Sequence, residues 1–271
     1  GGLHGVGISV VNALSDRLSV EIARDRKLWT QAYKRGKPLS PLTKSGPMPN
    51  RRGTTVSFHP DPEIFGPRAA LKPARLMKMA RSKAYLFSGV EIRWKCAPEL
   101  LKDGDDTPAE AVFHFPGGLA DYLAESLAGA PCCADQPFAG KVDFAEKYGA
   151  DTPGSVEWAV NWTPARDGFV SSYCNTVPTP EGGTHEQGFW AAVLKGLRAY
   201  GELASVKKAA MLTREDVQGA ACAMISIFIR EPEFVGQTKD RLATTEAARL
   251  AEGAVRDRFD TWLAADPKRA G

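Results

Sequence analysis

The chain opens with Gly1-Gly2-Leu3-His4-Gly5-Val6-Gly7, which runs directly into the apolar segment Ile8-Ser9-Val10-Val11-Asn12-Ala13-Leu14. Four of the first seven residues are glycine, which has no Cβ, so backbone N–H groups can close on a bound group and positive φ becomes accessible. The segment that follows predicts a short, buried helix, and the N-terminus of a helix favours negative charge. This stretch therefore predicts a backbone cradle for an anion such as a phosphate.

Two common phosphate-binding loops do not account for this stretch. A P-loop requires Gly-Lys-Ser/Thr, and the glycine stretch contains no lysine. A dinucleotide-binding fingerprint needs a preceding strand and a different glycine spacing. Glycine content alone leaves a tight structural turn as an equal alternative.

The first block of the chain, up to residue 127, mixes strand and helix patterns. Period-two alternation and β-forming runs predict five strands: 18–23, 27–34, 54–58, 90–95 and 111–115. The first two are expected to form a hairpin across a turn at 24–26, and the Gly- and Pro-rich sequence 36–52 is expected to be a loop. Helices are predicted from Pro73 and over 119–127. The first of these helices has a predicted apolar stripe of Leu76, Met79, Ala80 and Phe87.

The second block follows a composition shift at 128–154, which is rich in Gly, Ala, Pro and Asp. We therefore predict two domains, 1–127 and 128–271. Four residues, Val156, Trp158, Val160 and Trp162, share one face of a predicted strand, and 169–175 is predicted to be its hairpin partner. The apolar run 222–229 predicts a strand buried on both faces. Long helices are predicted over 184–203 and 242–263. Two successive blocks of this kind predict an α+β fold of two consecutive α/β sandwich domains.

Composition excludes several classes of protein. Of the 271 residues 43% are hydrophobic and 25% charged, as in a globular protein. No apolar run reaches the roughly 18–20 residues that cross a bilayer, so no membrane association is expected. The five cysteines show no C-x-x-C spacing, which suits a reducing cytoplasm, and the adjacent Cys132-Cys133 pair is expected to be unremarkable. The net charge of +3 neither establishes nor opposes binding to nucleic acid.

The string from Gly1 to Ser15 resembles the ATP lid and the following helix of type IIA DNA topoisomerase B subunits, which belong to the GHKL ATPase superfamily. The resemblance extends to about Arg258. It implies the C-terminal part of a GHKL ATPase domain, followed by a ribosomal-protein-like transducer domain. It also implies that a run of main chain wraps the triphosphate of ATP: Gly2, Leu3, His4, Gly5, Val6 and Gly7. The side chain of His4 is expected to be structural.

Three shorter strings extend the resemblance. The first, Arg51 to Val56, is similar to a family strand whose threonine helps to bind adenine, which implies this role for Thr54; by itself, a threonine there only favours a strand. Arg24 falls where the family has an arginine at the mouth of the adenine pocket, a place also used by aminocoumarin inhibitors. Without the resemblance, Arg24 is an exposed hairpin residue.

The string Gly236-Gln237-Thr238-Lys239 is similar to the part of the transducer that reaches into the ATP site. The resemblance implies that Gln237 and Lys239 contact the nucleotide, with Lys239 at the γ-phosphate. Charge-assisted hydrogen bonds of roughly 1.5–3 kcal/mol bias two domain arrangements by about 10- to 150-fold, which makes ATP occupancy a switch. The alternative is a solvated lysine.

The string Glu181 to Glu186 is a structural mark of the transducer in the family, and Thr184 or His185 is expected to cap the helix that follows. Four basic residues are predicted either to contact DNA or to be merely solvated: Lys195, Arg198, Lys207 and Lys208.

The family's general base, its magnesium-holding asparagine and its adenine-reading aspartate are expected before the first residue. The chain is therefore expected to be a fragment without ATPase activity of its own. For the complete protein, the resemblance implies ATP and Mg²⁺ as cofactors, ATP-dependent dimerisation through the ATPase domain, and DNA and the A subunit of topoisomerase IV as partners in a bacterial heterotetramer.

Two strings, 82–87 and 172–179, resemble topoisomerase IV more than gyrase. The gyrase B protein is the close alternative, because supercoiling depends chiefly on the partner subunit. A non-enzymatic binding module with a vestigial lid is a second alternative. An Hsp90- or MutL-type ATPase is a third, which shares the chemistry but not these long strings.

Overall fold

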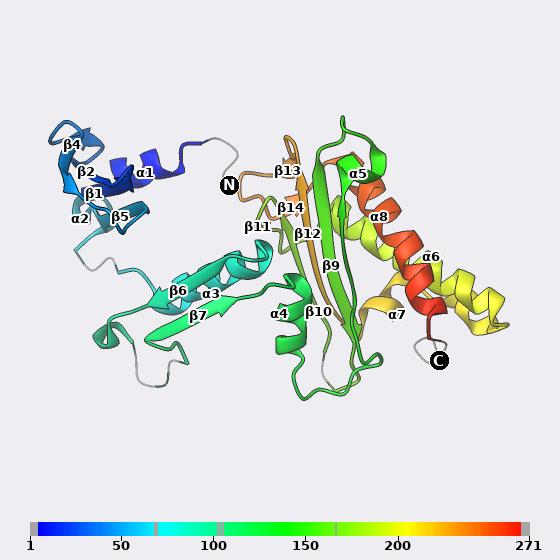
Figure 1. The fold of residues 1–271 in the computed structure, drawn as a ribbon. Coiled ribbons are helices and arrows are strands. Elements are labelled where there is room, and N and C mark those ends of the chain that lie inside the picture. Colours follow the sequence, from blue (N-terminus) through cyan, green and yellow to red (C-terminus); the bar gives the residue numbers. More distant parts are fainter. Residues whose placement is uncertain (1–4, 68–69, 102–103, 105, 166, 267–271) are drawn as a thin grey trace. The chain divides into compact units, whose positions relative to one another are not determined.

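The computed structural model describes residues 5–67, 70–101, 104, 106–165 and 167–266 (Figure 1). By packing, the chain divides into two compact units, Gly1–Lys72 and Pro73–Gly271. The boundary between functional domains at residues 127 and 128 stays a prediction.

The first unit is an antiparallel sheet with two short helices. Its elements are α1 (Gly7–Ala13), β1 (Ser15–Arg24), β2 (Lys27–Lys34), β3 (Lys37–Pro38), β4 (Thr43–Pro47), β5 (Gly53–Pro60) and α2 (Pro62–Phe65). The strand order is β3-β2-β1-β5, and β4 also pairs with β2. Asp25 and Arg26 connect β1 to β2 with φ of 54° and 59°. Two successive left-handed residues match the right-handed twist of a hairpin, and the predicted hairpin is confirmed.

Two predictions for this unit are wrong. The predicted loop 36–52 contains β3 and β4, because this segment returns along the free edge of β2 and pairs with it. The helix α1 forms as predicted but is not buried, since Ile8 is 55% and Val10 48% exposed. An apolar run predicts that a helix will be buried. It does not show that other residues of the same unit pack over that helix.

The second unit is a mixed sheet between two helical layers. Its helices are α3 (Pro73–Leu86), η1 (Pro98–Leu100), α4 (Leu119–Ser126), α5 (Phe144–Tyr148), α6 (Thr184–Leu203), η2 (Lys207–Met211), α7 (Arg214–Gln218) and α8 (Thr245–Ala264). Its strands are β6 (Glu91–Lys95), β7 (Glu110–His114), β8 (Phe138–Asp143), β9 (Gly154–Trp162), β10 (Phe169–Cys174), β11 (Val177–Pro178), β12 (Ala221–Ile229), β13 (Phe234–Val235) and β14 (Arg241–Leu242). The main sheet has the order β11-β10-β12-β9-β8.

The central strand β12 separates two cores. Ala223 and Ile225 lie in one cluster with residues of α6 and α8. Cys222 and Met224 lie in the other cluster with residues of α3 and α4. In Figure 1, α6 and α8 lie on one side of the sheet and α3 and α4 on the other. Burial on both faces is therefore confirmed for residues 222–227, whereas Phe228 and Ile229 are only partly buried.

The predicted hairpin of β9 with β10 is wrong. β12 lies between these two strands, parallel to β10 and antiparallel to β9. The physical reason is the apolar character of β12, which is satisfied only in the centre of a sheet with both faces covered.

Two helix predictions are also corrected. In α3 the buried residues are Ala84, Tyr85 and Leu86, whereas Met79 of the predicted stripe is 53% exposed. Only the C-terminal turn of α3 joins a core cluster. The last helix begins at Thr245 rather than at residue 242, because Arg241 and Leu242 pair with β13 as a strand.

Candidate functional site

The glycine loop is described only from Gly5 onward. Predicted contacts of Gly2, Leu3 and His4 with a triphosphate fall outside the described residues and stay predictions. Gly5 has a φ of +65°, and a Cβ built there would meet no atom within 4 Å. Val6, the N-cap residue of α1, makes no side-chain cap hydrogen bond. A left-handed glycine thus leads into a helix start whose first amides are not capped by the side chain of Val6.

Arg24 and Thr54 lie at the same end of the first sheet. In the antiparallel pair of β1 and β5, Ile22 lies opposite Thr54, and Arg24 ends β1 two residues later. The Arg24 side chain is 78% exposed and lies 3.7 Å from Asp25. Thr54 is exposed as well. The structure therefore brings these two residues to one strand end, and their roles toward adenine stay predictions.

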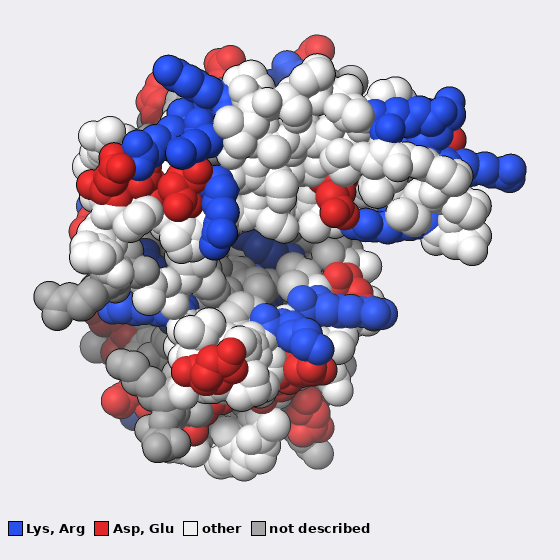
Figure 2. Space-filling model, turned by 90° about the vertical axis from the view of Figure 1, so that its left-hand side faces the viewer, with Lys and Arg blue, Asp and Glu red and all other residues white. Residues whose placement is uncertain are grey.

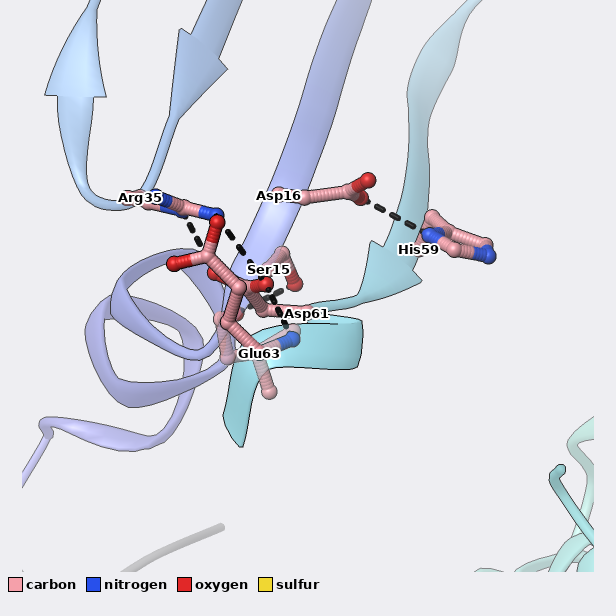
Figure 3. A network of polar contacts seen from close by, with 7 residues as sticks. Ser15, Asp16, Arg35, His59, Asp61 and Glu63 are labelled. Atoms are coloured by element: carbon pink, nitrogen blue, oxygen red, sulfur yellow. Dashed lines mark hydrogen bonds and ion pairs between the residues drawn. The ribbon is translucent and has the colours of Figure 1, made fainter. Parts of the chain in front are cut away.

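An ion network around the buried carboxylate of Asp61, missed by sequence reasoning, ties this sheet to α2 (Figure 3). The Nε of Arg35 donates to Oδ2 of Asp61 at 2.6 Å, and its Nη2 lies 2.5 Å from Oε1 of Glu63. Asp61 is almost fully buried and caps α2 by accepting the amide of Glu63 at 2.9 Å. The sequence signal for this cap is Asp61 followed by proline and Glu63, which is typical of a helix start.

The ion pairs of this network stabilise the fold and are not suited to proton transfer. The amide of Glu63 and the guanidinium of Arg35 lower the pKa of Asp61, and the two carboxylates raise the pKa of Arg35. A carboxylate held ionised by several donors is a poor proton acceptor. Beside it, Nδ1 of His59 lies 2.8 Å from Oδ1 of Asp16 (Figure 3). We assign these groups to positioning the corner of the sheet.

Gln237 and Lys239 lie at the tip of the β13–β14 hairpin. Gly236 and Lys239 both have positive φ, 75° and 63°. Nζ of Lys239 lies 6.0 Å from the ring centroid of Phe234. Gln237 is exposed. Gly5 belongs to the first unit and Lys239 to the second, so their convergence on one ligand stays a prediction.

The base of this hairpin is joined to the start of α6. Gly183 and Leu242 form a parallel bridge, and the hydroxyl of Thr184 donates to the carbonyl of Thr244 at 2.6 Å. The predicted capping of α6 by Thr184 or His185 is wrong, since the N-cap residue is Gly183 and the two side chains point elsewhere. His185 is fully buried, and neither ring nitrogen has a hydrogen-bond partner among the described residues. Burial lowers its pKa to about 4.

Three of the four predicted basic residues line one hollow between α6 and η2: Lys195, Arg198 and Lys207, with Arg256 from α8. Lys195 is paired with Glu252 at 2.5 Å, and Nη2 of Arg198 donates to the carbonyl of Leu212 at 2.5 Å. Lys208 is exposed on η2. The sequence pattern missed Arg256, which comes from a helix distant in sequence.

Charge elsewhere is mixed. On the face drawn in Figure 2, Lys and Arg side chains are interspersed with Asp and Glu. Within the described part of the chain, no group of three or more His, Cys, Asp or Glu side chains could hold a metal ion. None of the helices that the structure describes combines the length and apolarity needed to span a membrane.

Residues 118–271, more than half of the chain, match the family model described as DNA gyrase B. The chain belongs to the DNA gyrase B family. Among curated members, it is 53% identical over 270 residues to the DNA topoisomerase 4 B subunit of Bartonella bacilliformis and 54% identical over 274 residues to that of Caulobacter vibrioides. Each match covers 100% of this chain and 38% of the relative. The chain thus spans about two-fifths of the length of these relatives.

Solved structures of the family share the fold. The 43K ATPase domain of Thermus thermophilus gyrase B, in complex with an aminocoumarin, aligns with a TM-score of 0.77 and 30% identity over 98% of this chain and 69% of that one. The topoisomerase IV ATP-binding domain of Francisella tularensis, in complex with a small-molecule inhibitor, aligns with a TM-score of 0.76 and 28% identity over 100% of this chain and 70% of that one. The predicted α+β fold of the GHKL type is confirmed.

Proposed function

We propose that this chain is the ATP-lid and transducer part of a topoisomerase IV B subunit. In the complete protein, it would couple ATP binding and hydrolysis to closure of the N-terminal gate, DNA strand passage, decatenation and relaxation. The observation that carries this proposal is the match, along the whole chain, to relatives named as the B subunit of DNA topoisomerase 4. Since the chain spans only part of those relatives, the activity is proposed for the complete protein.

The proposed ligand is ATP. Main chain from Gly2 to Gly7 would wrap its phosphates, Thr54 would contact adenine, and Arg24 would lie at the pocket mouth. Gln237 and Lys239 would reach the γ-phosphate from the second unit. This is supported by the position of Thr54 and Arg24 at one strand end and by the exposed hairpin tip that carries Gln237.

Magnesium is proposed to bind through the nucleotide phosphates.

The proposed partners are DNA, the topoisomerase IV A subunit and a second copy of the B subunit, in a cytoplasmic heterotetramer. DNA contact is proposed for Lys195, Arg198, Lys207 and Lys208. The hollow that gathers three of them supports it, although Lys195 and Arg198 also hold partners within the chain. Duplex binding that weakens with salt and on neutralising these residues tests this contact.

The experiment that tests the proposal uses the complete protein, reconstituted with its A subunit. With ATP, we expect interlinked DNA circles to be separated and relaxed plasmid to gain no negative supercoils. The isolated 271-residue chain should show no ATP turnover. ATP turnover by the isolated chain would contradict the proposal that the general base of the ATP site lies outside these residues.

The gyrase B protein is the second candidate, supported by the description of the matching family and by the Thermus thermophilus neighbour. Introduction of negative supercoils by the reconstituted enzyme would decide for gyrase. Absence of any ATP turnover by the complete protein would instead favour a binding module with a vestigial lid.

A further inference from the structure

A groove in the second unit runs between α3 and the outer edge of β10. It has a volume of about 730 Å³. One wall consists of Arg75, Lys78 and Met79 from α3, and the other includes Val170 and Pro180.

The outer edge of β10 is covered for only part of its length. β11 pairs with residues 173–174, and the amide of Thr179 donates to the carbonyl of Ser172 at 2.9 Å. In a strand, the backbone groups of alternate residues point to the same edge. The N–H and C=O of Val170 therefore point to the same outer edge as the carbonyl of Ser172.

The chain leaves this edge just before it would cover Val170. Continuing the β10–β11 register would place Glu181 opposite Val170. The amide of Glu181 donates instead to the carbonyl of Asp240 at 2.9 Å. Diversion of Glu181 toward the β13–β14 hairpin thus leaves Val170, inside the groove, without a pairing partner on this edge among the described residues.

The side chains around this position combine positive charge with apolar surface. Arg75 and Lys78 are exposed and lie one helical turn apart, and no Asp or Glu is among the described residues that line the groove. Met79 is 53% and Val170 37% exposed. The hydroxyl groups of Tyr85 and Tyr173 share a hydrogen bond of 2.7 Å, so the tyrosines that line the groove are already partnered.

We propose that this groove binds an extended acidic peptide segment of a partner protein by strand addition. Main chain of the peptide pairs with Val170, beyond the part of β10 that β11 covers, in the manner of peptides that bind between a strand edge and a helix. Its carboxylates on the α3 side pair with Arg75 and Lys78, and its apolar side chains on the opposite side cover Val170. Alternating acidic and apolar residues meet both demands, because successive side chains of a strand point to opposite faces.

The probe is a fluorescein-labelled peptide of alternating Glu and Val, and its affinity for the full chain is measured by fluorescence anisotropy. We expect the double variant Arg75→Glu/Lys78→Glu to weaken binding by about tenfold or more, since two charge-assisted contacts become repulsive. The matched control, Lys141→Glu/Arg258→Glu, changes net charge equally at exposed residues outside the groove and should alter affinity by less than about twofold.

Two further arms use the unmodified chain, so they do not depend on the folding of a variant. A peptide with the same side chains but N-methylated amides should bind at least about tenfold more weakly, because it cannot donate to the strand edge. Hydrogen exchange of the Val170 amide should slow in the complex. A peptide of alternating Lys and Val should not bind.

Three outcomes would overturn the proposal. Equal binding of the N-methylated peptide would exclude strand addition. If the groove variant and the control variant lost affinity for the acidic peptide equally, the loss would be an effect of net charge and not of the groove. Failure of the acidic peptide, together with duplex DNA that binds through Arg75 and Lys78, would assign the groove to nucleic acid instead.

Discussion

The buried imidazole of His185 makes the stability of the second unit sensitive to acid. Its pKa is lowered from 6.5 to about 4 by burial, and neither ring nitrogen has a hydrogen-bond partner among the described residues. The unfolded chain takes up this proton as the pH falls below about 6.5, whereas the folded protein does so only near pH 4. The contribution of His185 to stability is therefore present above pH 6.5 and lost as the pH falls through 4.

The size of this effect follows from the two pKa values. Each pKa unit corresponds to about 1.4 kcal/mol, so a change from 6.5 to about 4 amounts to about 3.4 kcal/mol when complete. Lowering the pH from 7 to 5 should express about 2 kcal/mol of that difference in the free energy of unfolding. His185→Leu cannot take up the proton and should lack this loss.

The assay is urea unfolding of the unmodified chain and of His185→Leu at pH 7 and pH 5. Nearby Glu186 is present in both proteins, so the difference between their pH responses isolates His185. The control is His114→Leu, which alters an exposed histidine on β7 and should keep the full pH response. If His185→Leu lost as much stability between pH 7 and pH 5 as the unmodified chain, the reasoning from burial would be refuted.

Three other predictions concern a hydrogen bond, a close approach and the proposed phosphate contact. Tyr85→Phe and Tyr173→Phe should each lower the free energy of unfolding in urea by about 1–3 kcal/mol, because each leaves a buried hydroxyl without its partner. The double variant should lower it by less than the sum of the two single effects, and strict additivity would contradict the pairing. Gly183→Ala should lower stability by more than about 2 kcal/mol, since φ is +137° and the new Cβ would lie against the backbone of Leu242. An unchanged melting temperature would disprove this close approach. Lys239→Ala in the complete protein should slow ATP turnover about tenfold or more, and unchanged turnover would remove Lys239 from the site.

Patterns local to the sequence predicted most helices and strands, but not how the strands are ordered. The apolar run of β12 predicted burial on both faces, which the two core clusters confirm. The same reasoning paired β9 with β10, because strands close in sequence often pair. Only the complete sheet shows that β12 inserts between them. Period-two alternation indicates a face of a strand and carries no information about its neighbour.

The same limit applies to the candidate site. The glycine loop and the 236–239 string are each continuous in sequence, so the resemblance to the family singles them out as strings. The partnership of Arg35 with Asp61 and the approach of Arg256 to the basic hollow join distant segments. The isolation of the His185 ring also depends on what surrounds it in space. No spacing rule relates such residues.

The central position of β12 also has a consequence during synthesis on the ribosome. β9 and β10 leave the ribosome first, and the strand that joins them follows only after the segment between Cys174 and Ala221. At roughly 5–20 residues per second, that segment takes several seconds to be made. During this interval, β9 has β8 and β10 has β11 as a neighbour, but the edge of each strand that β12 will cover is unpaired, and unpaired strand edges are templates for aggregation. Early folding of this unit therefore depends on protecting β9 and β10 until β12 arrives.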